Sequence, residues 1–247
     1  MTAADHALAA SLASEAGRLL LQVRQRDLPD AAARKAAGDT ESHRFLVDEL
    51  ARQRPDDAVL SEEGADDPAR LSADRVWIVD PLDGTREFSE PGRADWAVHV
   101  ALWERGELVA GAVALPAESV TFATPAPPSP APRADGPIRL VVSRSRPPVL
   151  VAELATRLRG ELVPLGSAGV KAMAVVRGQA DAYVHGGGQY EWDSAAPVAV
   201  ARAAGLHTSR LDGSPLRYNQ PSPWSPDLLV CRPELADDLL GALAETL

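Results

Sequence analysis

The sequence has few of the residues that stabilise secreted or membrane-inserted proteins. Cys231 is its one cysteine among 247 residues, so no disulfide can form within the chain, and nothing indicates an oxidising compartment. No apolar run approaches the roughly 20 residues that a membrane-spanning helix needs. No Lys or Arg precedes Arg18, which does not fit a signal peptide. We therefore expect a soluble cytoplasmic protein with no membrane partner.

Basic charge is also scarce. The chain has 25 Lys and Arg against 35 Asp and Glu, for a formal net charge of −10. Such a chain repels the phosphate backbone of nucleic acids, so we expect no nucleic-acid polymer as a partner. A small anionic substrate remains compatible, because bound cations can reverse the local charge. Hydrophobic residues make up 45% of the chain, which is enough for a folded core.

Several common catalytic motifs are missing. The stretch His185 to Gly188 is similar to an esterase oxyanion loop, but no Gly-x-Ser-x-Gly nucleophile turn accompanies it. We therefore interpret these glycines as a flexible loop. The sequence has neither a Gly-x-Gly-x-x-Gly motif nor a phosphate-binding P-loop. Its five histidines show no zinc-site spacing.

What the chain does contain is a pair of carboxylates after an apolar run. Val76 to Val79 predicts a buried strand, which we expect to end at Asp80 because Pro81 has no N–H for the ladder. Gly84 then permits a tight turn. Asp80 and Asp83 would thus lie together, and buried like charges repel each other. Mg²⁺ or Mn²⁺ would relieve that repulsion, since carboxylates are their preferred ligands.

The N-terminal half, residues 1–124, reads as α+β. Apolar spacing predicts helices over 5–26 and 40–54, with a break at Gly38-Asp39 between them. Alternating or continuous apolar runs predict four further strands, over 59–60, 97–103, 108–115 and 119–123. Residues 125–137 contain six prolines and are interpreted as a linker.

The C-terminal half, residues 138–247, alternates between strand and helix patterns. Predicted strands cover 140–142, 162–163, 180–184 and 228–231. Predicted helices cover 149–159, 168–177, 194–204 and 234–243. Alternation of this kind is typical of an α/β sheet covered by helices.

The stretch from Asp80 to Thr85, Asp-Pro-Leu-Asp-Gly-Thr, resembles the signature of the inositol monophosphatase superfamily of metal-dependent phosphomonoesterases. The continuation Arg86-Glu87-Phe88 and the segment Glu191-Trp192-Asp193 resemble its CysQ-type branch, which acts on 3′-phosphoadenosine 5′-phosphate. The fold that this resemblance implies is a layered αβαβα sandwich. The resemblance covers most of the chain through three ordered acidic motifs.

The resemblance also implies a metal site. Its ligands would be Glu62, Asp80, Asp83, Asp193 and the carbonyl of Leu82, holding two or three Mg²⁺ ions, with Mn²⁺ as the alternative. Thr85 and Asp39 would be the catalytic pair that orients the attacking water. For three of these acids the sequence leaves a structural alternative: Glu62 in an acidic surface turn, Asp193 at a helix start, and Asp39 as the cap of a helix beginning at Thr40.

Substrate binding extends this set. Besides Glu62, Leu82, Asp83 and Asp193, we expect the phosphate to be received by Gly84, Thr85, Gly166, Ser167 and Lys171. Turn amides form anion-binding nests, and Lys171 is the candidate cation for a second phosphate. Ser143-Arg144 is a second candidate. A solvated lysine on a helix surface is the alternative interpretation of Lys171.

The predicted function is that of a Mg²⁺-dependent 3′(2′),5′-bisphosphate nucleotidase in sulfur assimilation. It would convert 3′-phosphoadenosine 5′-phosphate, and by extension 3′-phosphoadenylyl sulfate, to the nucleotide without its 3′-phosphate. Two alternatives stay open: an inositol-1-phosphatase or fructose-1,6-bisphosphatase of the same superfamily, and a non-catalytic sensor of metal and nucleotide. The resemblance further implies a homodimer and inhibition by Li⁺.

Overall fold

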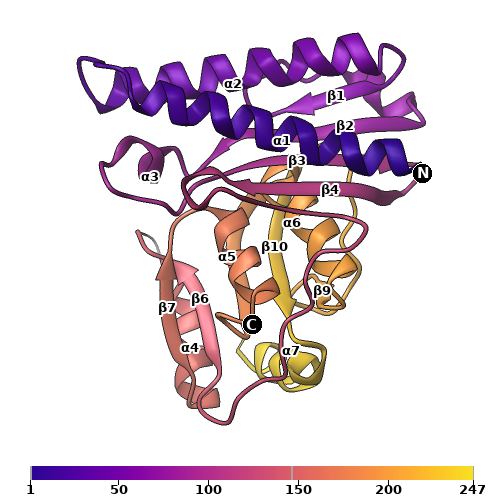
Figure 1. Cartoon of the computed structure of the whole chain (residues 1–247). Helices are drawn as coiled ribbons and strands as arrows, with labels where there is room; N and C mark the ends of the chain where they lie inside the picture. The colour runs from indigo at the N-terminus through magenta and orange to yellow at the C-terminus, as the bar shows by residue number, and fades with distance from the viewer. Residues whose placement is uncertain (1, 146, 247) are drawn as a thin grey trace.

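The chain is arranged in five layers in the order αβαβα (Figure 1). The computed structural model describes residues 2–145 and 147–246. One outer layer consists of α1 (Ala3–Arg24) and α2 (Ala31–Gln53), and the other of α4 (Val149–Leu158) and α7 (Ala236–Ala244). The middle layer consists of α5 (Ala168–Val176) and α6 (Glu191–Ala203). This arrangement confirms the predicted sandwich.

The first sheet is built from the N-terminal half. Its strands in spatial order are β1 (Ala58–Ser61), β2 (Arg75–Asp83), β3 (Ala97–Glu104), β4 (Glu107–Leu115) and β5 (Val120–Ala123). Only β1 and β2 run parallel. Along β2 the side chains alternate: Trp77 joins the core under α1 and α2, while Ile78 joins the core under α5 and α6. Helices cover both faces, which explains why the strands are almost continuously apolar.

The second sheet follows the proline-rich segment, in which residues 124–138 form no helix or strand. Its order is β7 (Glu161–Leu165), β6 (Arg139–Ser143), β8 (Ala182–Tyr190), β10 (Trp224–Cys231) and β9 (His207–Ser209). Parallel pairing joins β7, β6 and β8, and antiparallel pairing joins β8, β10 and β9. The strands predicted over 140–142 and 162–163 correspond to β6 and β7, whereas β9 was not predicted.

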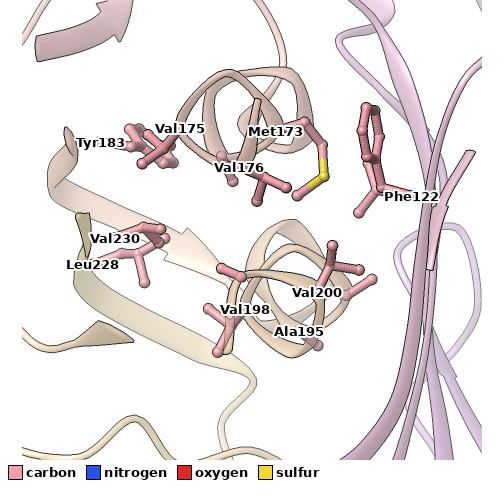
Figure 2. Close-up of a cluster of buried hydrophobic side chains, with 14 of the residues drawn as sticks. Phe122, Met173, Val175, Val176, Tyr183, Ala195, Val198, Val200, Leu228 and Val230 are labelled. Atoms are coloured by element: carbon pink, nitrogen blue, oxygen red, sulfur yellow. The ribbon is translucent and has the colours of Figure 1, made fainter. Parts of the chain in front are cut away.

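A single buried cluster joins the two halves across the middle layer. Figure 2 shows Met173 of α5 next to Phe122 of β5, with Val198 of α6 and Val230 of β10 on the side of the cluster away from Phe122. Burial of such apolar surface is the main stabilising term in folding. The cluster therefore fixes α6 against β2, and with it the acidic residues that the two elements carry.

The predicted break at Gly38-Asp39 is wrong, because α2 runs through both residues. A side chain on Gly38 would lie 2.7 Å from Cε1 of Phe88 and 2.9 Å from Cδ2 of Leu82. The glycine therefore allows the helix to approach these two residues closely, at the cost of some helix propensity. Asp39 lies inside the helix, so it is not the cap of a helix at Thr40.

The strand predicted to end at Asp80 instead continues to Asp83. Its pairing with β3 shifts register between Asp80 and Asp83, so Pro81 lies at an irregularity of the ladder, where proline is tolerated. The carbonyl of Pro81 accepts a hydrogen bond of 2.7 Å from Ser42 Oγ on α2. Gly84 follows with φ +86°, as the predicted turn requires.

The interpretation of Gly186 to Gly188 as a flexible loop is also wrong. These glycines belong to β8, which extends to Tyr190 and pairs with β10 on either side of one register shift. As a result, α6 begins at Glu191 and Asp193 lies in its first turn. None of the helices in the described ranges combines the length and hydropathy needed to span a bilayer.

Candidate active site

The two carboxylates at the end of β2 form the centre of the site. Asp80 and Asp83 are both buried, and Asp80 Oδ1 accepts a hydrogen bond of 3.0 Å from the Leu82 N–H across the irregular turn. Burial, together with repulsion from Glu62 and Asp83, raises the pKa of Asp80 well above its usual value. The environment of Asp80 therefore disfavours the charged form of this carboxyl group.

Asp83 has a different environment from Asp80. Its Oδ2 accepts hydrogen bonds from Ser167 Oγ and from the Gly169 N–H, the latter at 2.7 Å. Burial opposes ionisation, but His99 and the hydrogen bond from Ser167 outweigh it and lower the pKa of Asp83. The described residues give no hydrogen bond to Oδ1, which leaves that oxygen for a cation.

His99, on β3, is the buried residue behind Asp83. Its Nε2 lies 3.1 Å from Asp83 Oδ2, at an angle that is poor for a hydrogen bond. Its Nδ1 lies 3.0 Å from the Trp192 carbonyl, which can only accept, so Nδ1 carries a proton. A side chain on Gly169 would lie 2.1 Å from Nε2, so only glycine permits this packing.

Sequence reasoning missed His99. Ligand atoms of Asp80, Asp83 and His99 lie within 4.8 Å of one another, but the histidine comes from the neighbouring strand, so no short spacing reveals it. The available signal was a histidine in the otherwise apolar stretch 97–103, where an unpaired polar group would be costly.

Glu62 and Asp193 complete the acidic cluster from two other elements. Glu62 follows β1, and although much of the residue is exposed, its carboxyl group reaches Asp80. Desolvation there, with repulsion from Asp193 and Asp83, raises the pKa of Glu62 to about 7. Asp193 accepts a hydrogen bond of 2.6 Å from the Tyr190 N–H. Burial and repulsion from Asp83 raise the pKa of Asp193 to about 6.

These four carboxylates suit a cation. Raised pKa values at Glu62, Asp80 and Asp193 show that the cluster holds more negative charge than its own hydrogen bonds stabilise. A divalent cation would replace the protons, and oxygen donors are the ligands that Mg²⁺ and Mn²⁺ prefer. The residues present therefore fit a metal of this class.

A cavity of about 550 Å³ opens beside the acidic cluster. Asp83, Asp193, Ser167 and Lys171 are among its lining residues. A neighbouring cavity of about 530 Å³ is lined by Gly84 and Thr85, together with Lys35 and Arg86, and the two cavities share Ser145. The predicted phosphate-binding residues are thus divided between two adjoining spaces.

Lys171 is not the solvated helix lysine that the sequence left open. The residue is only 6% exposed. Its Nζ donates a hydrogen bond of 2.7 Å to the Ser167 carbonyl and lies 5.3 Å from the centroid of the Tyr183 ring. Burial lowers its pKa against the attraction of Asp83. A buried ammonium group therefore lies in the same cavity as the acidic cluster.

The remaining predicted site residues differ in whether they reach the two cavities. The Gly166 N–H donates a hydrogen bond of 2.7 Å to Asp95 Oδ2, so this N–H is not available to a substrate. Ser143 lines the first cavity, whereas the Arg144 guanidinium bonds to Glu87 at 2.7 Å. Asp39 is buried on α2, and burial together with repulsion from Glu63 raises its pKa to about 6. Neither cavity has Asp39 in its lining. Leu82 is buried beneath the turn.

The sequence of this chain is similar to those of known phosphatases. The sequence profile of the Inositol monophosphatase family matches residues 4–246. A 3′-phosphoadenosine 5′-phosphate phosphatase of Mycobacterium bovis is 55% identical, with 94% of this chain and 90% of the relative covered. The 3′(2′),5′-bisphosphate nucleotidase CysQ of Escherichia coli is 35% identical, with 84% and 91% covered.

Solved structures agree with the sequence relatives. The crystal structure of CysQ from Bacteroides thetaiotaomicron superimposes with a TM-score of 0.79 at 28% identity, covering 92% of this chain and 97% of that one. Profile, relatives and structure all match over most of the length of the chain. The protein belongs to the inositol monophosphatase family.

Proposed function

We propose that the protein is a metal-dependent phosphatase that converts 3′-phosphoadenosine 5′-phosphate to AMP and phosphate, in sulfur assimilation. The observation that carries the proposal is one cavity with a carboxylate cluster and the buried ammonium group of Lys171. This pairing suits a substrate with two phosphates, one at the metals and one at the cation. The names of the 55% and 35% identical relatives support the same substrate.

Glu62, Asp80, Asp83 and Asp193, with the Leu82 carbonyl, would hold two or three Mg²⁺ ions. When bound, such ions supply a coordinated water of lowered pKa and neutralise charge on the phosphate. Asp83 would offer its Oδ1 to such an ion, because its Oδ2 accepts hydrogen bonds from Ser167 and Gly169. Mn²⁺ is expected to substitute, since it accepts the same oxygen ligands.

The reaction is a hydrolysis. Oxygen from water forms the new bond to phosphorus, the bond from phosphorus to the ribose 3′-oxygen breaks, and that oxygen leaves with a proton. We assign Thr85 and Asp39 to orientation of the attacking water. Thr85 is the first residue of α3 (Thr85–Ser89) and lines the smaller cavity, whereas Asp39 is buried on α2. The backbone of Gly84 and Thr85 would receive phosphate oxygens.

Lys171 and Ser167 are proposed for the second phosphate. Both line the larger cavity, and Ser167 caps α5 by accepting 3.1 Å from the Val170 N–H. A helix N-terminus attracts anions, which adds to the charge of the lysine. Further proposals that follow the family resemblance are a homodimer, a cytoplasmic location, inhibition by Li⁺, and a division at the proline-rich segment into residues 1–124 and 138–247.

The decisive experiment is phosphate release with Mg²⁺ from 3′-phosphoadenosine 5′-phosphate, inositol 1-phosphate and fructose 1,6-bisphosphate in parallel, compared by kcat/KM. We expect a preference of at least about tenfold for the nucleotide, because the sugar phosphates lack a base. A preference for either sugar phosphate would overturn the substrate assignment and keep the metal site. Nucleotide binding without phosphate release from any substrate would identify a sensor instead.

A further inference from the structure

Arg70 is a buried cation that joins the two halves of the chain. It belongs to η1 (Pro68–Ser72), in the connection between β1 and β2, and is 1% exposed. Its Nη1 donates a hydrogen bond of 2.7 Å to Asn219 Oδ1, and its Nη2 donates one of 3.0 Å to the Gln220 carbonyl. In return, Asn219 Nδ2 donates a hydrogen bond of 3.2 Å to the Arg70 carbonyl. A residue of the N-terminal half thus binds a loop of the C-terminal half.

Glu191, the first residue of α6, binds the same two loop residues through their backbone. It is 2% exposed, and its two carboxylate oxygens accept hydrogen bonds of 2.6 Å from the Asn219 N–H and 2.8 Å from the Gln220 N–H. The Glu191 N–H donates a hydrogen bond of 2.7 Å to the Pro223 carbonyl. The loop therefore lies between a buried cation, which binds its acceptors, and a buried anion, which binds its donors.

Burial of these two charges is not explained by stability alone. Removal of charged side chains from water costs free energy that their attraction often only balances, so apolar residues of similar size would serve folding as well. A hydrogen-bonded buried network instead holds its members in one arrangement. That arrangement concerns the acidic cluster, because Glu191 stands two residues before Asp193 in the first turn of α6.

The network also reaches the segment that follows Glu62. Arg70 Nε donates a hydrogen bond of 2.6 Å to Asp66 Oδ1, and Nη2 donates one of 3.0 Å to Asp66 Oδ2. Asp66 follows Glu62 by four residues in the same connection between β1 and β2. One guanidinium group is therefore bonded to the segment after Glu62 and to the loop that binds the start of α6.

We propose that Arg70 is a positioning residue for the metal site, which sets the place of Asp193 relative to Glu62 through Asn219 and Glu191. The inference rests on the proposed function, which assigns Glu62 and Asp193 as metal ligands. These two acids come from different halves of the chain, so their separation depends on the contacts that hold the halves together. Loss of the outer partners of metal ligands typically reduces metal affinity or activity 10–100-fold.

Mn²⁺ binding to the full chain, followed by electron paramagnetic resonance without substrate, tests this role. Arg70→Met keeps an unbranched apolar side chain but removes every guanidinium donor, and we expect its Kd for Mn²⁺ to rise about tenfold. Asn219→Gly is the milder variant. It keeps the backbone N–H that Glu191 binds and suits the φ of +57° at this position, but it removes the Oδ1 that Arg70 binds. We expect its Kd to rise about threefold.

Arg232→Met is the matched control for loss of a buried, paired arginine. Arg232 is 4% exposed, and its Nε lies 3.0 Å from Asp181 Oδ1. Asp181 directly precedes β8, whereas Asp193 follows the other end of that strand. Arg232→Met should therefore lower the urea midpoint of unfolding and leave the Kd for Mn²⁺ unchanged.

A double-mutant cycle separates coupling from independent damage. In the double variant of Arg70→Met with Asn219→Gly, the rise in Kd should be smaller than the product of the two single rises, because both changes remove the same hydrogen bond. The double variant of Arg70→Met with Arg232→Met should bind Mn²⁺ as Arg70→Met does.

A folded Arg70→Met protein that has wild-type affinity for Mn²⁺ and only a lower urea midpoint would overturn the positioning role. If Arg70→Met does not fold, unchanged affinity in Asn219→Gly would overturn it equally. Should wild type bind Mn²⁺ but release no phosphate from any substrate, the proposed function fails, while the Kd values of the variants still decide the role of Arg70. If wild type does not bind Mn²⁺, both fail together.

Discussion

His99 Nε2 lies 3.1 Å from Oδ2 of Asp83, and both residues are buried. The histidine is fixed from behind by the Trp192 carbonyl, at the start of the helix that carries Asp193. One imidazole ring therefore joins β3, the end of β2 and the first turn of α6. Partners of this kind orient the residues that bind a metal, and their loss typically reduces metal affinity or activity 10–100-fold.

Replacing His99 by leucine should weaken metal binding, because Asp83 loses the group that packs behind its carboxylate. We expect the Mg²⁺ activation midpoint of His99→Leu to rise at least about tenfold. Binding of Mn²⁺, followed directly by electron paramagnetic resonance, should weaken in parallel. His207→Gln is the control, since His207 bonds to Ser209 on β9. An unchanged Mn²⁺ affinity in a folded His99→Leu protein would contradict the assigned role.

Asp83→Asn should abolish most of the turnover while the protein stays folded. The amide can still accept hydrogen bonds from Ser167 and Gly169 through its oxygen, but it cannot supply a charged ligand. We expect kcat to fall by about two orders of magnitude. Asp135→Asn, at an exposed position in the proline-rich segment, serves as the control. Wild-type kcat at saturating Mg²⁺ would show that Asp83 is not a metal ligand.

Lys171→Met keeps the buried aliphatic stem and removes the charge. If the ammonium group contacts a second phosphate, KM should rise about tenfold or more for a nucleotide bisphosphate, and much less for a monophosphate. Arg177→Met, at the other end of the same helix, removes a cation that pairs with Glu118 instead. Equal effects of Lys171→Met on both substrates would remove the lysine from the second-phosphate site.

The lowered pKa of Asp5 leads us to expect a pH-dependent contribution to the free energy of unfolding. Burial opposes its ionisation, but hydrogen bonds from Arg75, at 2.9 Å, and from Thr2 outweigh burial and lower its pKa from 3.8 to about 2. Because the folded-state pKa is the lower one, the stabilisation is complete above about pH 4 and is lost as pH falls through about 2. At neutral pH the shift corresponds to about 2 kcal/mol.

Urea unfolding at several pH values measures this contribution. Asp5→Asn should lower the free energy of unfolding by about 2 kcal/mol at pH 7, and the difference from wild type should shrink as pH falls below about 4. Asp135→Asn again provides the exposed control. A difference that stays constant down to about pH 2 would mean that Asp5 acts through packing alone.

The sequence was sufficient for the layers and for the acidic motifs. Helix and strand periods are local properties, so α1, α4, β3 and β4 were predicted close to their observed bounds. The run from Asp80 to Thr85 is likewise contiguous, and its resemblance to the family signature agrees with the profile match. The local sequence pattern wrongly predicted a break at Gly38, because the close approach of Phe88, which leaves no room for a side chain there, is a tertiary feature that helix propensity does not register.

Only the tertiary structure identified His99 and decided between the two interpretations of Lys171. His99 reaches Asp83 through strand pairing, and Lys171 is buried because α5 is packed between two sheets. Gln189 directly follows the glycines that were interpreted as a loop, and the unpaired state of its buried amide emerges only when every neighbour is known. The sequence thus determined which residue types carry the chemistry. Packing between distant segments decided which of them are buried, paired and turned toward the same cavity, because burial and charge pairing are properties of neighbours in space.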